Sequence, residues 1–250
     1  MKPQNVDLVL LVDSSKSMQP CFDQLREHLK DLLYPLEQSN FRTRFALLAY
    51  CATRLDDGRP YYWHTFVGGD DPDEMDKKLY GPSMRVDDYF TYDTGKIIQI
   101  LAKLVPRGDE DTLMALDTAA DLPFNPPDTT RRVIALFTDE RIEDGVNGAR
   151  PISKIPELIQ KLMSRRIQLF VSAPFSPALE QLGSLDRAEI EAVDGGDGLK
   201  AVGFKKLLAQ MGKSISVSSL QMGPEPAWNK ALFGQKRFDY VRPVERWSGA

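Results

Sequence analysis

The sequence predicts an α/β fold: a doubly wound, mostly parallel central sheet with helices on both faces. Short apolar runs alternate along the chain with longer segments whose apolar residues recur at helical spacing, and this alternation is typical of a parallel sheet. Several of the short runs are apolar on both faces, as strands in the interior of such a sheet are. At 250 residues, the chain lies within the range of one large domain.

The first predicted strand is Val6–Val12, a run that is apolar except at Asp7. A polar loop follows at Asp13–Pro20. Apolar residues then recur at helical spacing from Phe22 to Leu36, which predicts an amphipathic helix.

Two further strands and an unusual segment come next. Phe41–Thr53 is predicted to be a buried strand because its second half is almost wholly apolar. Tyr61–Val67 has mixed polarity, so we expect it at the edge of the sheet. The acidic segment Gly68–Thr94 has few aliphatic residues and is interpreted as an insertion or long loop with a solvated surface.

The regular alternation resumes after this insertion. Periodicity and apolar runs predict helices at Ile97–Val105, Asp111–Leu122, Ile155–Ser164 and Phe204–Met211, and strands at Arg132–Thr138, Ile167–Ala173 and Ile215–Leu220. We therefore expect one domain at residues 1–222, with the acidic insertion at about 68–94. Residues 223–250 are rich in aromatic residues and proline without a clear period, and are expected to pack on the domain or on a partner as an extension.

Composition excludes several classes of function. The net charge of −4 argues against a nucleic-acid-binding face, which needs a concentrated basic surface. No apolar stretch approaches the length of a membrane span, and the N-terminus has no signal-peptide pattern. Cys21 and Cys51 lack zinc-site spacing; sparse cysteine usage favours the cytoplasm, although a disulfide between the two stays an alternative.

Two predicted strands end at an aspartate, and this is the strongest functional signal. Asp13 follows the first strand and Asp139 follows the strand Arg132–Thr138. Ligands of open α/β sheets bind beyond the carboxyl ends of the strands, where the strand order reverses. If these strands are neighbours at that point, both carboxylates face one crevice.

The residues after Asp13 favour a divalent cation. Ser15 and Ser17 form a D-x-S-x-S pattern, in which two hydroxyls of a tight loop can point at one position. Oxygen ligands without Cys or His select Mg²⁺, Mn²⁺ or Ca²⁺ over zinc. The alternative is structural, because an aspartate before serines often caps a helix, and Ser17 could be such an N-cap.

DSSKSM at Asp13–Met18 resembles the first motif of von Willebrand factor A domains, and FTDE at Phe137–Glu140 resembles their strand-ending T-D motif. The resemblance extends over roughly residues 6–220 and implies a Rossmann-like fold with a metal-ion-dependent adhesion site. It implies that Asp13, Ser15, Ser17 and Asp139 are metal ligands, with the two serines binding directly.

The family's remaining ligand is a threonine about five residues before a small residue, and the sequence departs from this pattern. Counting back from Ala115 reaches Glu110, while Thr112 would need a shift of two residues. The count favours Glu110, with Thr112 as the alternative. A carboxylate there would bind metal more tightly and weaken its attraction for a partner's carboxylate.

The resemblance implies a binding module without catalytic activity, in which the cation accepts an acidic side chain of a protein partner. Intracellular bacterial relatives often act as assembly factors, and this chain is expected to be an adaptor or assembly factor of that kind. Lys16, beside the site, is a candidate partner-binding residue. The alternatives are a Mg²⁺-dependent phosphohydrolase with Asp13 as nucleophile and a scaffold that does not use metal.

Overall fold

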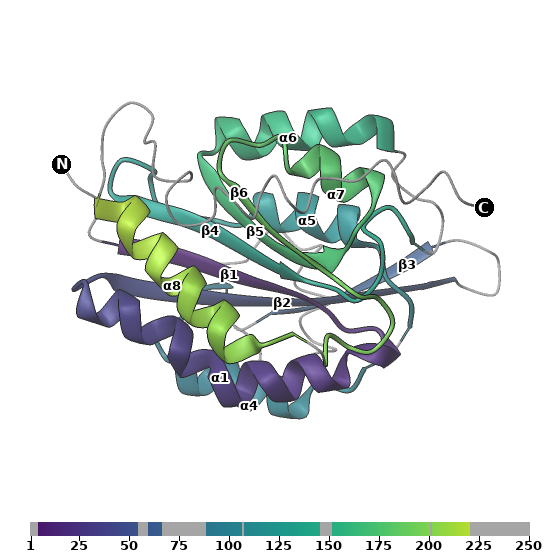
Figure 1. The fold of residues 1–250 in the computed structure, drawn as a ribbon, viewed down its shortest axis with the longest axis horizontal. Coiled ribbons are helices and arrows are strands. Elements are labelled where there is room, and N and C mark those ends of the chain that lie inside the picture. Colours follow the sequence, from purple (N-terminus) through teal and green to yellow (C-terminus); the bar gives the residue numbers. More distant parts are fainter. Residues whose placement is uncertain are drawn as a thin grey trace.

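The central feature is a six-stranded sheet in the order β3-β2-β1-β4-β5-β6 (Figure 1). The computed structural model describes residues 5–54, 60–66, 89–106, 108–145, 152–200 and 202–220. Five strands are parallel, and β3 pairs antiparallel with β2 at one edge. The strands are β1 (Asn5–Asp13), β2 (Arg42–Arg54), β3 (Pro60–Phe66), β4 (Thr130–Phe137), β5 (Ile167–Pro174) and β6 (Ala188–Val193).

Helices cover both faces of the sheet, and each face has its own core. Alternate residues of a strand point to opposite faces, so the continuously apolar strands supply both cores. One core lies under α1 (Gln19–Gln38), α4 (Thr94–Lys103) and α8 (Phe204–Leu220), and the other under α5 (Thr112–Ala120), α6 (Ile155–Ser164) and α7 (Pro177–Leu182). Short 3₁₀ turns, η1 (Lys16–Met18) and η2 (Ile152–Lys154), precede α1 and α6.

The predicted doubly wound α/β fold is therefore confirmed, including the edge position of the third strand. One prediction is wrong: Ile215–Leu220 is the end of α8 and not a strand. The buried residues Leu208, Met211 and Ile215 recur at helical spacing, so the helical face continues past the predicted end at Met211. The strand β6 and the short helix α7 were not predicted.

The strand order reverses beside β1, which lies between β2 and β4. The register pairs Val12 of β1 with Phe137 of β4, so the carboxyl ends of both strands reach the same edge of the sheet. This is the position at which open α/β sheets bind ligands.

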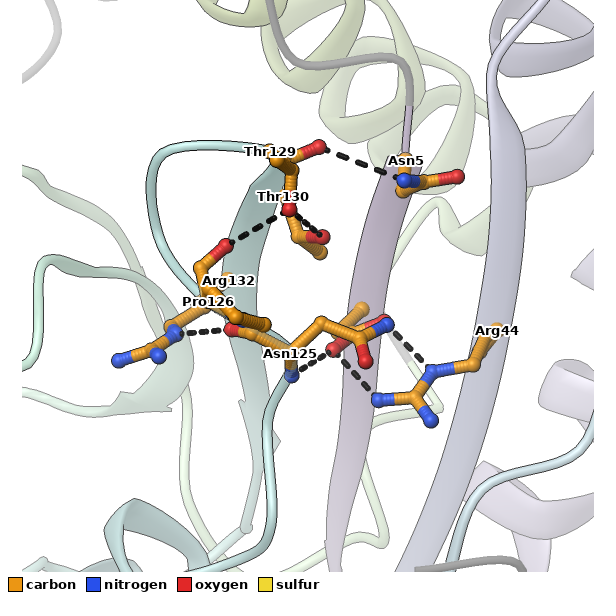
Figure 2. Close-up of polar contacts among 8 residues, drawn as sticks. Asn5, Arg44, Asn125, Pro126, Thr129, Thr130 and Arg132 are labelled. Atoms are coloured by element: carbon orange, nitrogen blue, oxygen red, sulfur yellow. Dashed lines mark hydrogen bonds and ion pairs between the residues drawn. The ribbon is translucent and has the colours of Figure 1, made fainter.

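At the amino-terminal end of β1, a buried hydrogen-bond network contains an ion pair between Asp7 and Arg44. Asp7 of β1 is fully buried and accepts two hydrogen bonds from the Arg44 guanidinium, at 2.8 and 2.7 Å. The backbone N–H of Asn125 donates to the same carboxylate at 2.7 Å. Figure 2 shows Arg44 and Asn125 converging there, while Arg132 donates to the Asn125 carbonyl oxygen at 2.8 Å.

Two predictions concern residues outside the described ranges: most of the acidic insertion, up to residue 88, and the extension at 223–250. Cys21 and Cys51 are both buried and are not joined in a disulfide. None of the described helices combines the length and the apolar character that a membrane span requires.

Candidate functional site

The first loop of the site follows β1 directly. The backbone N–H of Ser15 donates to Asp13 Oδ1 at 2.7 Å, which closes a tight turn at the end of the strand. The hydroxyls of Ser15, the N-cap residue of η1, and Ser17, within η1, lie 3.3 Å apart. The N-cap of α1 is Met18, and no side chain caps this helix. The alternative interpretation of Ser17 as an N-cap is therefore wrong.

The second loop follows β4 and meets the first. Ser17 Oγ donates to Asp139 Oδ1 at 2.9 Å, and Thr138 Oγ1 donates to Asp13 Oδ2 at 2.8 Å. These two contacts cross-connect the loops, since each loop supplies one hydroxyl to the aspartate of the other. The structure thus brings together Asp13, Ser15, Ser17 and Asp139, as the sequence predicted.

The electrostatics of this cluster are unusual. Asp13 and Asp139 are both fully buried, and neither forms an ion pair with a lysine or arginine among the described residues. Burial raises the pKa of the Asp13 carboxyl from 3.8 to about 7, against the opposing effect of the hydrogen bonds from Ser15 and Thr138. Burial and the charges of both aspartates also raise the pKa of the Cys21 thiol beneath the site.

The third loop of the site, residues 108–111 before α5, is held by two isolated backbone bridges. Asp109 exchanges hydrogen bonds with Ala52 of β2 at 2.7 and 2.6 Å, and Asp111 bridges to Gly145. Gly108 has a φ of +73°, and a Cβ there would lie 2.5 Å from the Ala52 carbonyl oxygen, so glycine is required for this approach. Glu110 lies between the two bridges, where the backbone is fixed on both sides.

Glu110 and Thr112 have different surroundings. Burial, and then the charges of Asp13, Glu140, Asp109 and Asp139, raise the pKa of the Glu110 carboxyl to about 8, which indicates that it lies close to the other carboxylates. Thr112 is fully buried on α5, and its hydroxyl lies 2.9 Å from the hydroxyl of Tyr50. The Thr112 hydroxyl therefore already has a partner, and Glu110 is the more available of the two candidates.

The rim of the site carries one basic and one acidic side chain. Lys16 is exposed on η1 between the two serines. Glu140 is half-buried, and burial together with the charges of Asp139 and Asp144 raises the pKa of its carboxyl. In the sequence, Glu140 is marked only by its place in the FTDE motif.

The available donors fit a hard divalent cation. They are carboxylate and hydroxyl oxygens, which Mg²⁺, Mn²⁺ and Ca²⁺ prefer. Within the described ranges, no three His, Cys, Asp or Glu side chains form a metal-holding group by themselves. A cation would therefore need the hydroxyls of Ser15 and Ser17 in addition to the carboxylates, and its charge would offset the repulsion between Asp13, Asp139 and Glu110.

Two neighbours of the site were missed in the sequence. Tyr50 of β2 is the register partner of Asp13 and contacts Thr112, and Gly198 donates its backbone N–H to Asp139 Oδ2 at 2.7 Å. The only sequence signal near Gly198 is the run Asp194–Gly198, which contains three glycines. Such a run indicates a loop and says nothing about which carboxylate it meets.

Comparisons with known proteins agree with this description. The sequence profile of the von Willebrand factor type A domain matches residues 7–194, which includes the first and second loops and Glu110. No curated protein matches the chain.

Solved structures match the chain at low sequence identity. The proximal thread matrix protein 1 from the mussel byssus has a TM-score of 0.51 at 13% identity, over 86% of this chain and 47% of that chain. The pilus adhesin SpaC from Lactobacillus rhamnosus GG, in an open conformation, has a TM-score of 0.49 at 13% identity, over 87% of this chain and 30% of that one. The chain therefore spans less than half the length of these structures.

Proposed function

The chain belongs to the von Willebrand factor type A domain family, and from this premise we propose that it is a protein-binding module that holds its partner through a divalent cation. Domains of this family typically mediate protein–protein interactions. The observation that most directly supports cation dependence is the hydrogen bond of 2.9 Å from Ser17 to Asp139. It joins two loops that are distant in the sequence into one cluster of oxygen atoms.

In this proposal, Asp13, Ser15, Ser17 and Asp139 hold the cation, with Glu110 as the ligand from the third loop. Thr112 stays the alternative for that position, although its contact with Tyr50 argues against it. The cation is Mg²⁺, or Mn²⁺ or Ca²⁺, because all of these ligands are hard oxygen donors.

A bound cation would supply a Lewis-acidic coordination position at which an acidic side chain of the partner binds. Lys16, exposed between the two serines, would then contact the same acidic region of the partner. We propose that the module serves as an adaptor or assembly factor. The expected cytoplasmic location stays a prediction.

We propose binding and not catalysis as the role of the site. A phosphohydrolase with Asp13 as nucleophile needs a second carboxylate two residues later as general acid, and Ser15 is at that position. The Ser15 hydroxyl lies beside that of Ser17, as expected for a pair of metal ligands.

The test is calorimetric titration of the metal-stripped full chain with Mg²⁺ and with Mn²⁺. We expect one cation per chain for the wild type and no measurable binding for the double variant Ser15→Ala/Ser17→Ala. The matched control is Ser164→Ala/Ser184→Ala, which removes two exposed serine hydroxyls that bond only to local carbonyl oxygens. The control variant is expected to bind as the wild type does.

Absence of binding in the wild type would refute cation dependence and favour the metal-independent scaffold. Once binding is established, partners are sought by affinity capture with the cation present and with chelator. A partner held equally by the wild type and by Ser15→Ala/Ser17→Ala would contradict the proposed role of the cation.

A further inference from the structure

The loop between β6 and α8, described at residues 194–200 and 202–203, lies against the candidate metal site. The backbone N–H of Gly196 donates to the carbonyl oxygen of Asp139 at 3.0 Å. The backbone N–H of Gly198 donates to the Asp139 carboxylate, at Oδ2, at 2.7 Å. The next residue, Leu199, is buried in the core beneath α1 and α8, which anchors the loop in this position.

Gly198 also touches the first loop. Its φ is +61°, a conformation that favours glycine. A Cβ at Gly198 would collide with the carbonyl oxygen of Ser17 and would lie 2.7 Å from Cδ of Pro20. Since both obstacles are backbone or ring atoms, they cannot move aside as a flexible side chain would.

Gly198 therefore contacts both loops that carry the predicted ligands. With its bond, each carboxylate oxygen of Asp139 has one donor, because Oδ1 accepts from Ser17 and Oδ2 from Gly198. The carboxylate is held from two sides, and neither donor brings a positive charge that would compete with a cation. Hydrogen bonds of this kind orient metal-binding side chains and tune their affinity.

We propose that the β6–α8 loop is a fourth loop of the metal site and that Gly198 is a positioning residue within it. Its N–H orients the Asp139 carboxylate, and its missing side chain lets the Ser17 loop approach Asp139. This inference rests on the proposed function, because it assigns a role toward the cation that the site is proposed to hold.

Two other glycines of the same loop serve as comparisons. Gly203 has open space around it and no positive φ, so Gly203→Ala is the neutral control. Gly196 has a φ of +91° and nothing within 4 Å of an added Cβ, so Gly196→Ala introduces backbone strain without a collision. Gly196→Ala thus measures backbone strain alone, whereas Gly198→Ala adds the collision with Ser17.

The experiment is Mg²⁺ titration of Gly198→Ala, Gly196→Ala and Gly203→Ala, with thermal unfolding of each variant in chelator and in saturating Mg²⁺. We expect Gly198→Ala to bind Mg²⁺ about tenfold or more weakly than the wild type, as is typical when a group that orients a ligand is disturbed. Its rise in Tm on adding Mg²⁺ should shrink accordingly. A purely structural role would lower Tm in chelator but leave the Mg²⁺ affinity at the wild-type value.

A second measurement needs no substitution at Gly198. Residue-resolved amide hydrogen exchange of the metal-free full chain is compared between the wild type and Asp139→Ala. The Gly198 N–H loses its acceptor in this variant, so its exchange should accelerate about tenfold or more. The Gly196 N–H donates to the backbone of residue 139, which remains, and its exchange should change little.

The outcomes separate the two proposals. A wild-type chain that binds neither Mg²⁺ nor Mn²⁺ overturns the proposed function and this inference with it. Wild-type affinity in Gly198→Ala, or unchanged exchange of Gly198 in Asp139→Ala, overturns this inference alone. If Gly198→Ala does not fold, the exchange measurement decides.

Discussion

Two aspartates at opposite ends of β1 are both fully buried, and their surroundings differ in charge. Asp7 is paired with the Arg44 guanidinium and also accepts a backbone N–H from Asn125. Asp13 accepts hydrogen bonds from Ser15 and Thr138, but it lies near two further carboxylates, Asp139 and Glu110, and has no described basic partner.

The two ends of β1 therefore differ in charge compensation: Asp7 has a basic partner, and Asp13 has none among the described residues. A buried carboxylate without a counter-charge is costly, and its pKa rises until it takes up a proton or a cation binds. A carboxylate that is paired with an arginine, as Asp7 is, needs neither a proton nor a cation. At the amino-terminal end of β1, the buried carboxylate thus has a basic partner within the chain. At the carboxyl-terminal end, we propose that a bound cation supplies the missing positive charge.

The largest expected effect comes from removing the arginine that pairs with Asp7. Arg44→Met leaves Asp7 buried and uncompensated, and should lower the free energy of unfolding by about 3–5 kcal/mol. Urea denaturation in chelator measures this. The double variant Asp7→Asn/Arg44→Met removes both charges and should recover part of the loss. A loss below about 1 kcal/mol in the single variant would show that the pair is not important for stability.

The second prediction concerns pH at the other end. In the metal-free protein, the pKa of Asp13 is about 7, above its ordinary 3.8, so between these pH values the folded state keeps a proton that the unfolded state has released. Stability should therefore fall as pH rises from 5 to 8, by on the order of 2 kcal/mol from this group.

Urea denaturation at several pH values measures this slope, and Asp13→Asn is the matched control because asparagine does not titrate. The variant should show a flatter pH dependence than the wild type. An equal slope in both chains would mean that Asp13 is not the group responsible.

The third prediction distinguishes the two candidates in the third loop. Glu110→Gln removes a negative charge near the cation and should weaken Mg²⁺ binding at least about tenfold. Thr112→Val removes only the hydroxyl that contacts Tyr50; it should cost roughly 1 kcal/mol of stability and leave Mg²⁺ affinity nearly unchanged. Calorimetric titration of both variants checks this. The reverse pattern would make Thr112 the ligand.

The fourth prediction couples cation binding to protons. Carboxylate ligands must be deprotonated, and the pKa values of Asp13 and Glu110 are raised to about 7 and about 8. The apparent Mg²⁺ affinity should therefore increase about tenfold or more between pH 6 and pH 8. Titrations at fixed ionic strength measure this, and affinity that is independent of pH would contradict the raised pKa values.

The smallest effect should come from an exposed pair on the loop that follows Asn125. Asp128 forms an ion pair with Arg166 at 3.2 Å, and their side chains are 82% and 58% exposed. Asp128→Asn should therefore change the free energy of unfolding by less than about 1 kcal/mol. A loss as large as that of Arg44→Met would show that position at this end of the sheet, and not burial, decides the importance of a pair.

Much of the fold could be predicted because its strongest signals are local. The runs that form β1 and β4 are apolar on both faces, which identifies interior strands without knowledge of their neighbours. The strand β6 was missed although Ala188–Glu191 alternates apolar and polar residues, because the strand has only 6 residues and most of them are only partly buried. The end of α8 was mistaken for a strand because Ile215–Leu220 alternates polar and apolar residues locally, while its helical face becomes clear only with Leu208 and Met211.

The candidate site likewise has a part that local sequence predicts and a part that depends on tertiary contacts. The sequence by itself determined the short motif of Asp13, Ser15 and Ser17 and the strand-ending Asp139, because the relative positions of residues within one loop are set by local spacing. Only the tertiary structure decided that Ser17 meets Asp139, that Tyr50 contacts Thr112, and that Gly198 lies against both Asp139 and Ser17. These contacts join segments far apart along the chain, and the order and register of the strands bring them together. Local spacing carries no information about such contacts, because they depend on how the whole sheet and its covering helices pack.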